Sequence, residues 1–264
     1  MIRSMYSGIS GLKNFQTKLD VIGNNIANVN TYGFKKGRTV FKDLYSQTVA
    51  GASAPGAVRG GVNPKQVGLG SQLAAIDTIH SGGSMQTTGN TLDLAIEGDG
   101  FFIVGENGGT ENFYTRAGNF YLDEAGDIVD GDGRYLLDEG GAKINVDLEA
   151  TSLSIGQDGA VNIVLNGVLT PIGNVGLAKF NNPGGLTKVG GNLYQESANS
   201  GAASEGLPLA EGRGAIKSGS LEMSNVDLSE EFTEMIVAQR GFQANTRIIT
   251  TSDEILQELV NLKR

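Results

Sequence analysis

The 264-residue chain has no cysteine and no tryptophan, only 5 prolines and a single histidine. Without cysteine it can form no disulfide, no thiolate metal site and no cysteine nucleophile. With His80 alone it can build neither a multi-histidine metal site nor a relay through a second histidine. We expect His80 to be a surface or strand residue.

Long apolar runs are also missing. No segment approaches the roughly 20 apolar residues of a membrane-spanning helix, so we expect no membrane insertion. The first residues, Met1–Ser4, lead into mixed polar and apolar sequence, without the apolar run and small-residue cleavage site of a secretory signal. If the protein is exported, we expect a route that does not depend on a cleaved signal peptide.

Basic residues are too few and too scattered for a nucleic-acid partner. Lys and Arg number 20 against 29 Asp and Glu, a net charge of −9, whereas phosphate binding needs clustered Lys and Arg. Gly68-Leu69-Gly70 does not continue into a dinucleotide-binding fingerprint, and residues 130–133 are better explained as a hairpin turn than as a calcium loop. We therefore expect no metal, no cofactor and no catalytic residue, and we predict that the chain is not an enzyme.

Both ends of the chain predict long helices with a narrow apolar seam, because large apolar residues recur there every seven positions. The predicted seam residues are Met5, Leu12, Leu19 and Ile26 at the N-terminal end and Leu228, Met235, Phe242, Ile249 and Leu256 at the C-terminal end. The first helix is expected to end in Asn28–Asn30, before a turn at Gly33. Asp227, followed by Glu230, fits the N-terminal cap of the second helix.

The sequence between the helices indicates a β domain. Most of the 40 glycines of the chain lie here, without a collagen-like period. Residues 92–104 alternate in polarity and then become continuously apolar, as strands do. Turn signals such as Asn166-Gly167 follow at short intervals, which is typical of antiparallel sheets. Residues 46–75, rich in Gly, Ala and Ser, are expected to be a mobile or extended connector.

We therefore predict an α+β fold in which the terminal helices form one composite coiled-coil domain and an antiparallel all-β domain is inserted between them. The predicted divisions are residues 1–30 for the N-terminal helix, 31–85 for an extended connector, 86–205 for the β domain, 206–221 for a return connector and 222–264 for the C-terminal helix. Long helices need partners, because most helix stability comes from packing. The two helices either pair only with each other or also pack against further copies of the chain, and the sequence leaves both possibilities open.

Three segments resemble the bacterial flagellar rod and hook proteins. The stretch from Asp20 to Lys35 is similar to the N-terminal signature of that family, residues 93–102 and 114–120 are similar to its β domain, and Gly219–Leu262 completes the match. The resemblance thus extends over nearly the whole chain. The motif residues are Asn24, Asn25, Ala27, Asn28, Thr31, Gly33, Phe34, Lys35, Ser224, Asn225 and Val226.

Within the family, two sets of features point in different directions. The C-terminal segments, among them Asp227-Leu228-Ser229 and residues 259–262, resemble hook subunits, and this favours the hook protein as the first interpretation. The short chain and the Gly- and Ala-rich connector after Ser46 resemble distal rod proteins, which are the alternative. A remote third hypothesis is a secreted β-domain hydrolase or adhesin with helical tethers.

The resemblance implies a structural subunit that polymerises helically into a hollow tube. In a hook, that tube is flexible, joins the rod to the filament and transmits torque. The implied partners are further copies of the chain, flagellar rod and hook–filament junction proteins, the hook cap during assembly and the flagellar type III export apparatus. The implied location is the extracellular hook or the basal body, and the seam residues would form the assembly interface.

Overall fold

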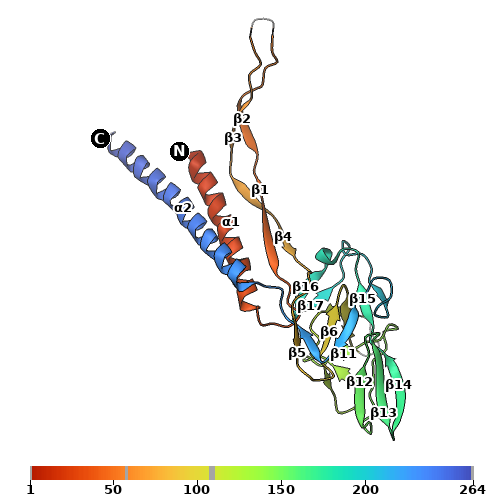
Figure 1. Ribbon diagram of the computed structural model, residues 1–264. Coiled ribbons are helices and arrows are strands. Elements are labelled where there is room, and N and C mark those ends of the chain that lie inside the picture. Colours follow the sequence, from red (N-terminus) through yellow and green to blue (C-terminus); the bar gives the residue numbers. More distant parts are fainter. Residues whose placement is uncertain (1, 57–58, 107–110, 263–264) are drawn as a thin grey trace. The chain divides into compact units, whose positions relative to one another are not determined.

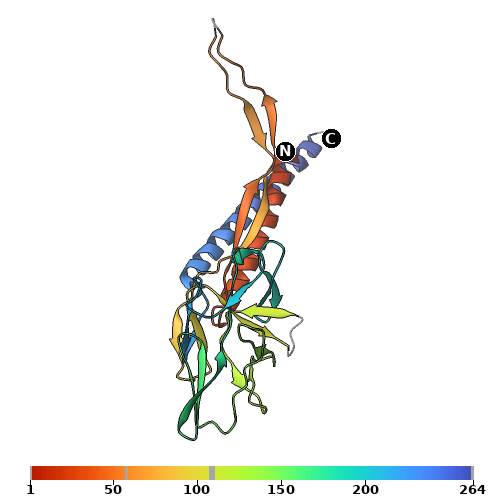
Figure 2. The same cartoon turned by 90° about the vertical axis from the view of Figure 1, so that its right-hand side faces the viewer.

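The computed structural model describes residues 2–56, 59–106 and 111–262 (Figures 1 and 2). As predicted, the fold is α+β, with a long helix at each end of the chain and mostly antiparallel strands between them. The chain divides into two units. Unit 1 consists of residues 1–27, 37–77 and 227–264, and unit 2 consists of residues 28–36 and 78–226.

These units divide the chain differently from the predicted domain ranges. Residues 78–85 and 206–221, which were assigned to connectors, belong to unit 2. The C-terminal helix begins at Leu228, not at residue 222, because residues 220–222 form a strand. The predicted ranges also contain residues 1, 57–58, 107–110 and 263–264, which lie outside the described residues.

Unit 1 contains the two helices, α1 (Ile2–Ala27) and α2 (Leu228–Asn261), which lie side by side in both views (Figures 1 and 2). The N-terminal cap predicted at Asp227 is present. The carboxylate of Asp227 accepts a hydrogen bond from the backbone N–H of Ser229 at 2.8 Å, and two acidic residues follow in the first turn. Both features stabilise a helix N-terminus, by capping it and by complementing its dipole.

The helices pack closely because small residues lie where they meet. A Cβ built on Gly241 would lie 2.5 Å from Cζ of Phe15, and one built on Gly11 would lie 2.9 Å from Oδ1 of Asn245. Ala238 is fully buried on the same helix as Gly241. Glycine at these positions therefore lets a ring and an amide of the facing helix lie directly against the backbone.

Strands complete unit 1. Strand β1 (Gly37–Asp43) pairs with β4 (Ser71–Thr78), and β2 (Ser46–Ala50) pairs antiparallel with β3 (Lys65–Gly68). The amide of Asn14 on α1 donates to the hydroxyl of Ser71 at 2.8 Å. Every residue of β2 and β3 is exposed. Much of the predicted connector of residues 46–75 is therefore extended and paired.

Unit 2 is built from short strands and a short 3₁₀ helix, η1 (Pro183–Gly185). The strands are β5 (Met85–Thr87), β6 (Leu94–Glu97), β7 (Phe101–Gly105), β8 (Asn112–Thr115), β9 (Tyr121–Leu122), β10 (Ile128–Val129), β11 (Tyr135–Leu136), β12 (Ser152–Ile155), β13 (Ala160–Leu165), β14 (Val168–Asn174), β15 (Leu177–Lys179), β16 (Thr187–Gly190), β17 (Leu193–Gln195), β18 (Ser204–Gly206), β19 (Ala215–Ser218) and β20 (Ser220–Glu222). The main sheet has the order β16-β17-β8-β7-β11-β10-β9, with β15 joining β7 to β18. Smaller sheets are β12-β13-β14, β19-β6 and β20-β5.

Strand β7 lies at the centre of this sheet and explains the continuous apolar run of the sequence. Phe102 and Val104 contribute to one buried cluster, and Phe101 and Ile103 contribute to another. Successive side chains of a strand point to opposite faces, so a strand covered on both faces needs apolar residues at every position.

The predicted turns are confirmed at two hairpins. Asn166 and Gly167 join β13 to β14 with φ of 51° and 79°, the left-handed pair that a two-residue hairpin requires. Between β10 and β11, the carboxylate of Asp130 accepts hydrogen bonds from the backbone N–H groups of Asp132 and Arg134. Asp130 therefore shapes a turn, as predicted, because its side chain satisfies the turn's backbone donors.

Candidate assembly surface and buried ion cluster

The predicted seam residues lie in unit 1 with different degrees of burial. Those that are partly buried are Met5, Leu12, Leu19, Ile26, Met235, Ile249 and Leu256. Leu228 and Phe242 are exposed. Within the helix pair, a Cβ on Gly8 would lie 3.5 Å from Cγ1 of Ile249, so this seam residue faces α1.

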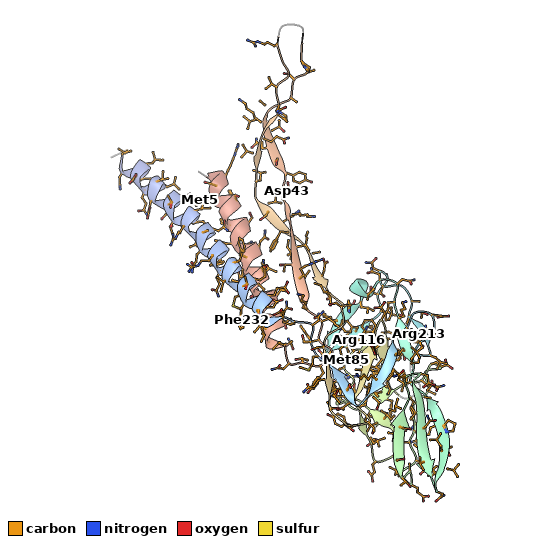
Figure 3. All side chains as sticks on the ribbon, in the orientation of Figure 1. Met5, Asp43, Met85, Arg116, Arg213 and Phe232 are labelled. Atoms are coloured by element: carbon orange, nitrogen blue, oxygen red, sulfur yellow. The ribbon has the colours of Figure 1, made fainter. Side chains whose placement is uncertain are left out.

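Helix α2 and the residue after it expose further large apolar side chains. Ile248, Ile255 and Leu262 form a second seven-residue series that the sequence also shows beside the main seam, and Phe232, Ile236, Val237, Leu259 and Val260 lie outside both series. Phe232 is labelled near the start of α2 in Figure 3, where Met5 marks α1. Along the whole of α2, the buried residues are only Glu231, Ala238 and Ser252. We call the exposed apolar residues of α2 the α2 surface.

Asn25, a motif residue, connects three elements of unit 1. Its amide nitrogen donates to the carbonyl of Gly37 at 2.9 Å, and its amide oxygen accepts from the N–H of Gly37 at 2.9 Å. The same nitrogen donates to the carboxylate of Glu231 on α2 at 3.2 Å. Asn25 is buried, and these bonds satisfy its polar atoms while fixing the start of β1.

Gly33, also a motif residue, has to be glycine. Its φ is +67°, and a Cβ there would lie 2.5 Å from both the backbone N of Ala117 and the carbonyl carbon of Arg116. Its N–H donates to the carbonyl of Glu222 at 2.8 Å. The turn predicted before it is present, since the N–H of Thr31 donates to the carbonyl of Asn28 at 3.2 Å.

Unit 2 contains a buried cluster of charges, which we call the Glu222 cluster: Lys35, Arg116 and Glu222 (Arg116 is labelled in Figure 3). Their side chains are 0%, 3% and 1% exposed. The ammonium of Lys35 lies 2.6 Å from one carboxylate oxygen of Glu222, and a guanidinium nitrogen of Arg116 lies 3.2 Å from the other. The carboxylate also accepts from the N–H of Gly83 at 2.9 Å.

The cluster joins segments that are distant in the sequence. Lys35 also donates to the carbonyl of Ser81 at 2.8 Å, and Arg116 donates to the carbonyl of Gly98 at 2.8 Å. Burial lowers the pKa of Lys35, and the attraction and hydrogen bond of Glu222 oppose that shift. A buried charge of this kind is tolerated only when it is paired and hydrogen-bonded. Glu222 therefore fixes the segments around residues 35, 83 and 116 together.

Asn225 adds a second set of bonds between the same segments. Its amide oxygen accepts from the N–H of Lys36 at 2.8 Å, and its nitrogen donates to the carbonyl of Ile79 at 2.8 Å. Ser224 is buried. Of the other motif residues, Asn28, Thr31, Phe34 and Val226 are partly buried, and Asn24 and Ala27 are exposed.

His80 differs from its prediction as a surface or strand residue. It lies outside the strands and is partly buried, with its ring 5.6 Å from that of Phe101 and 5.4 Å from that of Tyr194. Burial lowers the pKa of His80 to about 4, and the positive charges of Lys35 and Arg116 add to the effect. The imidazole is therefore neutral at physiological pH.

Sequence reasoning missed Arg116 and Glu222 as site residues. The available signal was a single charge inside an otherwise small or apolar segment, as in Tyr114–Gly118 and Ser220–Met223. Among residues 2–56, 59–106 and 111–262, no group of three or more His, Asp or Glu side chains is placed to hold a metal ion. Nor does any helix within these ranges combine the length and apolar character needed to cross a membrane.

Three family models match the chain. Residues 5–35 match the model described as flagella basal body rod protein, residues 95–163 match the flagellar hook protein FlgE/F/G D1 domain, and residues 217–262 match the flagellar basal body rod FlgEFG protein C-terminal. The first match contains Asn25, Gly33 and Lys35, and the third contains Glu222. These models describe structural components of the flagellum, not an enzyme family.

Curated relatives match over the full length of the chain. The flagellar basal-body rod protein FlgG of Bacillus subtilis is 63% identical over 266 residues, covering 100% of both chains. FlgG of Borreliella burgdorferi is 40% identical over 268 residues, and the flagellar hook protein FlgE of the same species is 33% identical over 443 residues, again with 100% of both chains covered. Because the hook alignment is far longer than this chain, that hook protein has segments without a counterpart here. Full-length identity of this order, together with the three matching models, means that the chain belongs to the flagellar rod and hook protein family.

Proposed function

We propose that the chain is a structural subunit of the flagellar rod, the distal rod protein, and that it polymerises helically with copies of itself. The sequence alone favoured the hook protein, with the distal rod protein as the alternative; we now favour the distal rod protein. The 63% identity to a rod protein of equal length supports the rod, whereas the hook relative is less similar and longer. The C-terminal resemblance to hook subunits carries less weight than this full-length similarity.

The observation that carries the proposal is the α2 surface. Only three of the 34 residues of α2 are buried within the subunit, although most helix stability comes from packing. Its exposed apolar side chains run from Phe232 to Leu262, and so much exposed apolar surface on one element favours a contact site. We infer that the helices form a coiled-coil-like pair within one subunit and that the α2 surface packs against neighbouring subunits. The predicted seam residues would serve both contacts.

A structural subunit of a polymer needs no catalytic residue. The subunit would act through its contacts, and its partners would be copies of itself and adjoining rod proteins. We propose further that it reaches the flagellum through the flagellar export apparatus and that it functions in the basal body.

Electron microscopy of basal bodies from cells lacking this chain tests the placement. We expect rods that stop short and carry no hook, because a missing distal rod leaves the hook without a base. Complete rods without a hook would overturn the rod in favour of the hook. Intact flagella would refute a subunit of either kind.

A matched pair of variants tests the α2 surface. Ile236→Asp places a charge on this surface, where Ile236 is 59% exposed, and Gln239→Asp places the same charge at an exposed polar position of the same helix. We expect Ile236→Asp to block polymerisation and Gln239→Asp to leave it unchanged. Both should unfold within about 0.5 kcal/mol of the wild type, since exposed substitutions change stability little. Normal polymerisation of Ile236→Asp would remove this residue from the interface.

A further inference from the structure

Positive charge gathers in one part of unit 2, although the chain as a whole carries a net charge of −9. The Glu222 cluster holds two cations against one carboxylate, so it is positive by one charge. Lys188 lies next to it, with its ammonium donating to the carbonyl of Lys35 at 3.3 Å and lying 5.3 Å from the ring centroid of Phe34. A carbonyl and a ring do not neutralise the lysine, so the local excess of positive charge grows.

A pocket of about 260 Å³ opens beside this cluster. Its polar walls are formed by Arg116, His80, Lys179 and Asn181, with Asp99 also lining it, and its apolar walls are Phe101, Phe180 and Pro183. The ammonium of Lys179 donates to the carbonyls of Glu211 at 3.4 Å and Gly212 at 3.1 Å. Two cationic side chains therefore line the pocket against the single carboxylate of exposed Asp99.

Two buried polar atoms of the pocket residues have no partner among the described residues. They are Nε of Arg116 and Nδ1 of His80. The other guanidinium nitrogens of Arg116 are bonded to Glu222 and Gly98, so the N–H at Nε is a donor left over in a site 3% exposed. A buried donor without an acceptor is costly and rare, and this N–H adds to the positive potential beside the pocket.

We propose that this pocket binds a carboxylate. A carboxylate is attracted by the positive charges of Arg116 and Lys179, which line the pocket, and its charge offsets the excess of the Glu222 cluster. The apolar wall of Phe101 and Phe180 accommodates the methylene groups that precede the carboxylate in an acidic side chain. The source is either an Asp or Glu of a neighbouring copy, a case that rests on the proposed polymer, or a free carboxylate.

The single histidine of the chain provides a specific probe. His80 lines the pocket, so its ring signals in an NMR spectrum need no assignment among others and report directly on occupancy. The dilute full-length chain is titrated with sodium acetate at neutral pH and constant ionic strength, with sodium chloride as the matched anion. We expect a saturable shift of the His80 signals with acetate and none with chloride. A shift that does not saturate, or one that chloride reproduces, would overturn the proposal.

Two lysine variants separate this pocket from general charge effects. Lys179→Gln removes a pocket cation, and Lys217→Gln removes an exposed lysine of β19 in the same unit that does not line the pocket. We expect Lys179→Gln to weaken acetate binding about fivefold, the effect of losing one partly exposed charge pair, and Lys217→Gln to leave it unchanged. Equal weakening by both would refute the site. If Lys179→Gln fails to fold, the comparison of acetate with chloride on the wild type still decides.

Polymerisation then identifies the source of the carboxylate. If it belongs to a neighbouring copy, saturating acetate slows polymerisation of the wild type, and Lys179→Gln polymerises slowly without added acetate. If the ligand is free, acetate binds but polymerisation is unaffected. A chain that does not polymerise at all would contradict the proposed function, whereas the His80 titration would still test the pocket.

Discussion

Replacing Glu222 with glutamine keeps the size and shape of the side chain while removing the charge that Lys35 and Arg116 share. The two cations then remain buried, with side-chain exposures of 0% and 3% and without their carboxylate. Breaking a buried ion pair in this way costs about 3–5 kcal/mol, because an uncompensated charge stays in the interior. We therefore expect Glu222→Gln to lower the free energy of unfolding of unit 2 by that amount.

Removing Lys35 has a different consequence. In Lys35→Met the carboxylate of Glu222 keeps Arg116 at 3.2 Å and the N–H of Gly83 at 2.9 Å. One cation then faces one anion, and the methionine fills most of the space of the lysine chain. We expect a loss of about 1–2 kcal/mol, clearly smaller than for Glu222→Gln, since no unpaired charge is left behind.

Urea unfolding monitored by near-ultraviolet circular dichroism measures both variants. The chain has no tryptophan, so tyrosine dominates this signal, and Tyr114 and Tyr194 are buried in unit 2. Glu124→Gln is the control, because Glu124 is exposed in the same unit and its replacement should change stability by less than about 0.5 kcal/mol. Equal losses for Glu222→Gln and Lys35→Met, or a larger loss for the lysine variant, would refute the asymmetry that we derive from the geometry.

Three further predictions concern single residues. Burial and the neighbouring cations lower the pKa of His80 from 6.5 to about 4, so the unfolded state binds more protons below pH 6.5, and stability should fall by about 3 kcal/mol as the pH falls toward 4. In His80→Gln, the urea midpoint should depend less on pH between about 6.5 and 4. An unchanged pH dependence would mean that other groups cause the loss of stability. Gly241→Ala should destabilise unit 1 by about 1–3 kcal/mol, because the new methyl group would collide with the ring of Phe15. Gly23→Ala, with nothing within 4 Å of the added Cβ, should instead stabilise α1 by up to about 1 kcal/mol. Thermal unfolding followed by far-ultraviolet circular dichroism compares the two glycine variants. Equal effects would contradict the close packing of α1 and α2 at Gly241. Asp227→Ala should lower the free energy of unfolding by about 1 kcal/mol, because α2 loses its N-terminal cap. The same thermal unfolding experiment measures this loss, and an unchanged melting temperature would contradict it.

Local sequence signals predicted the elements whose conformation depends on near neighbours. The seven-residue spacing of apolar residues predicted both terminal helices, and Asp227 predicted where the second one starts. Asn166-Gly167 and Asp130 predicted hairpin turns, because the required left-handed dihedrals or side-chain hydrogen bonds involve residues only a few positions apart. The family resemblance also followed from contiguous residues, and the comparisons confirmed it.

Other features were beyond the reach of these signals. The strand at residues 220–222, just before α2, depends on pairing with β5, more than a hundred residues earlier in the chain. The exposure of Ile236 and Val237 could not be separated from core burial, since an apolar residue on a helix is compatible with either. The order of rod and hook was also misjudged from short segments, because the family shares those segments and the distinction lies in the whole chain.

Periodicity and contiguous motifs were enough to predict the helix–sheet–helix order, the main turns and the family. The contacts that the motif residues make become visible only in the folded chain. Lys35 lies next to Lys36 in the sequence, where both could be exposed charges, yet folding buries Lys35 against Glu222, which is 187 positions away. The pairing of two such distant charges, and the pocket beside them, arise from the assembly of strands that no local pattern specifies.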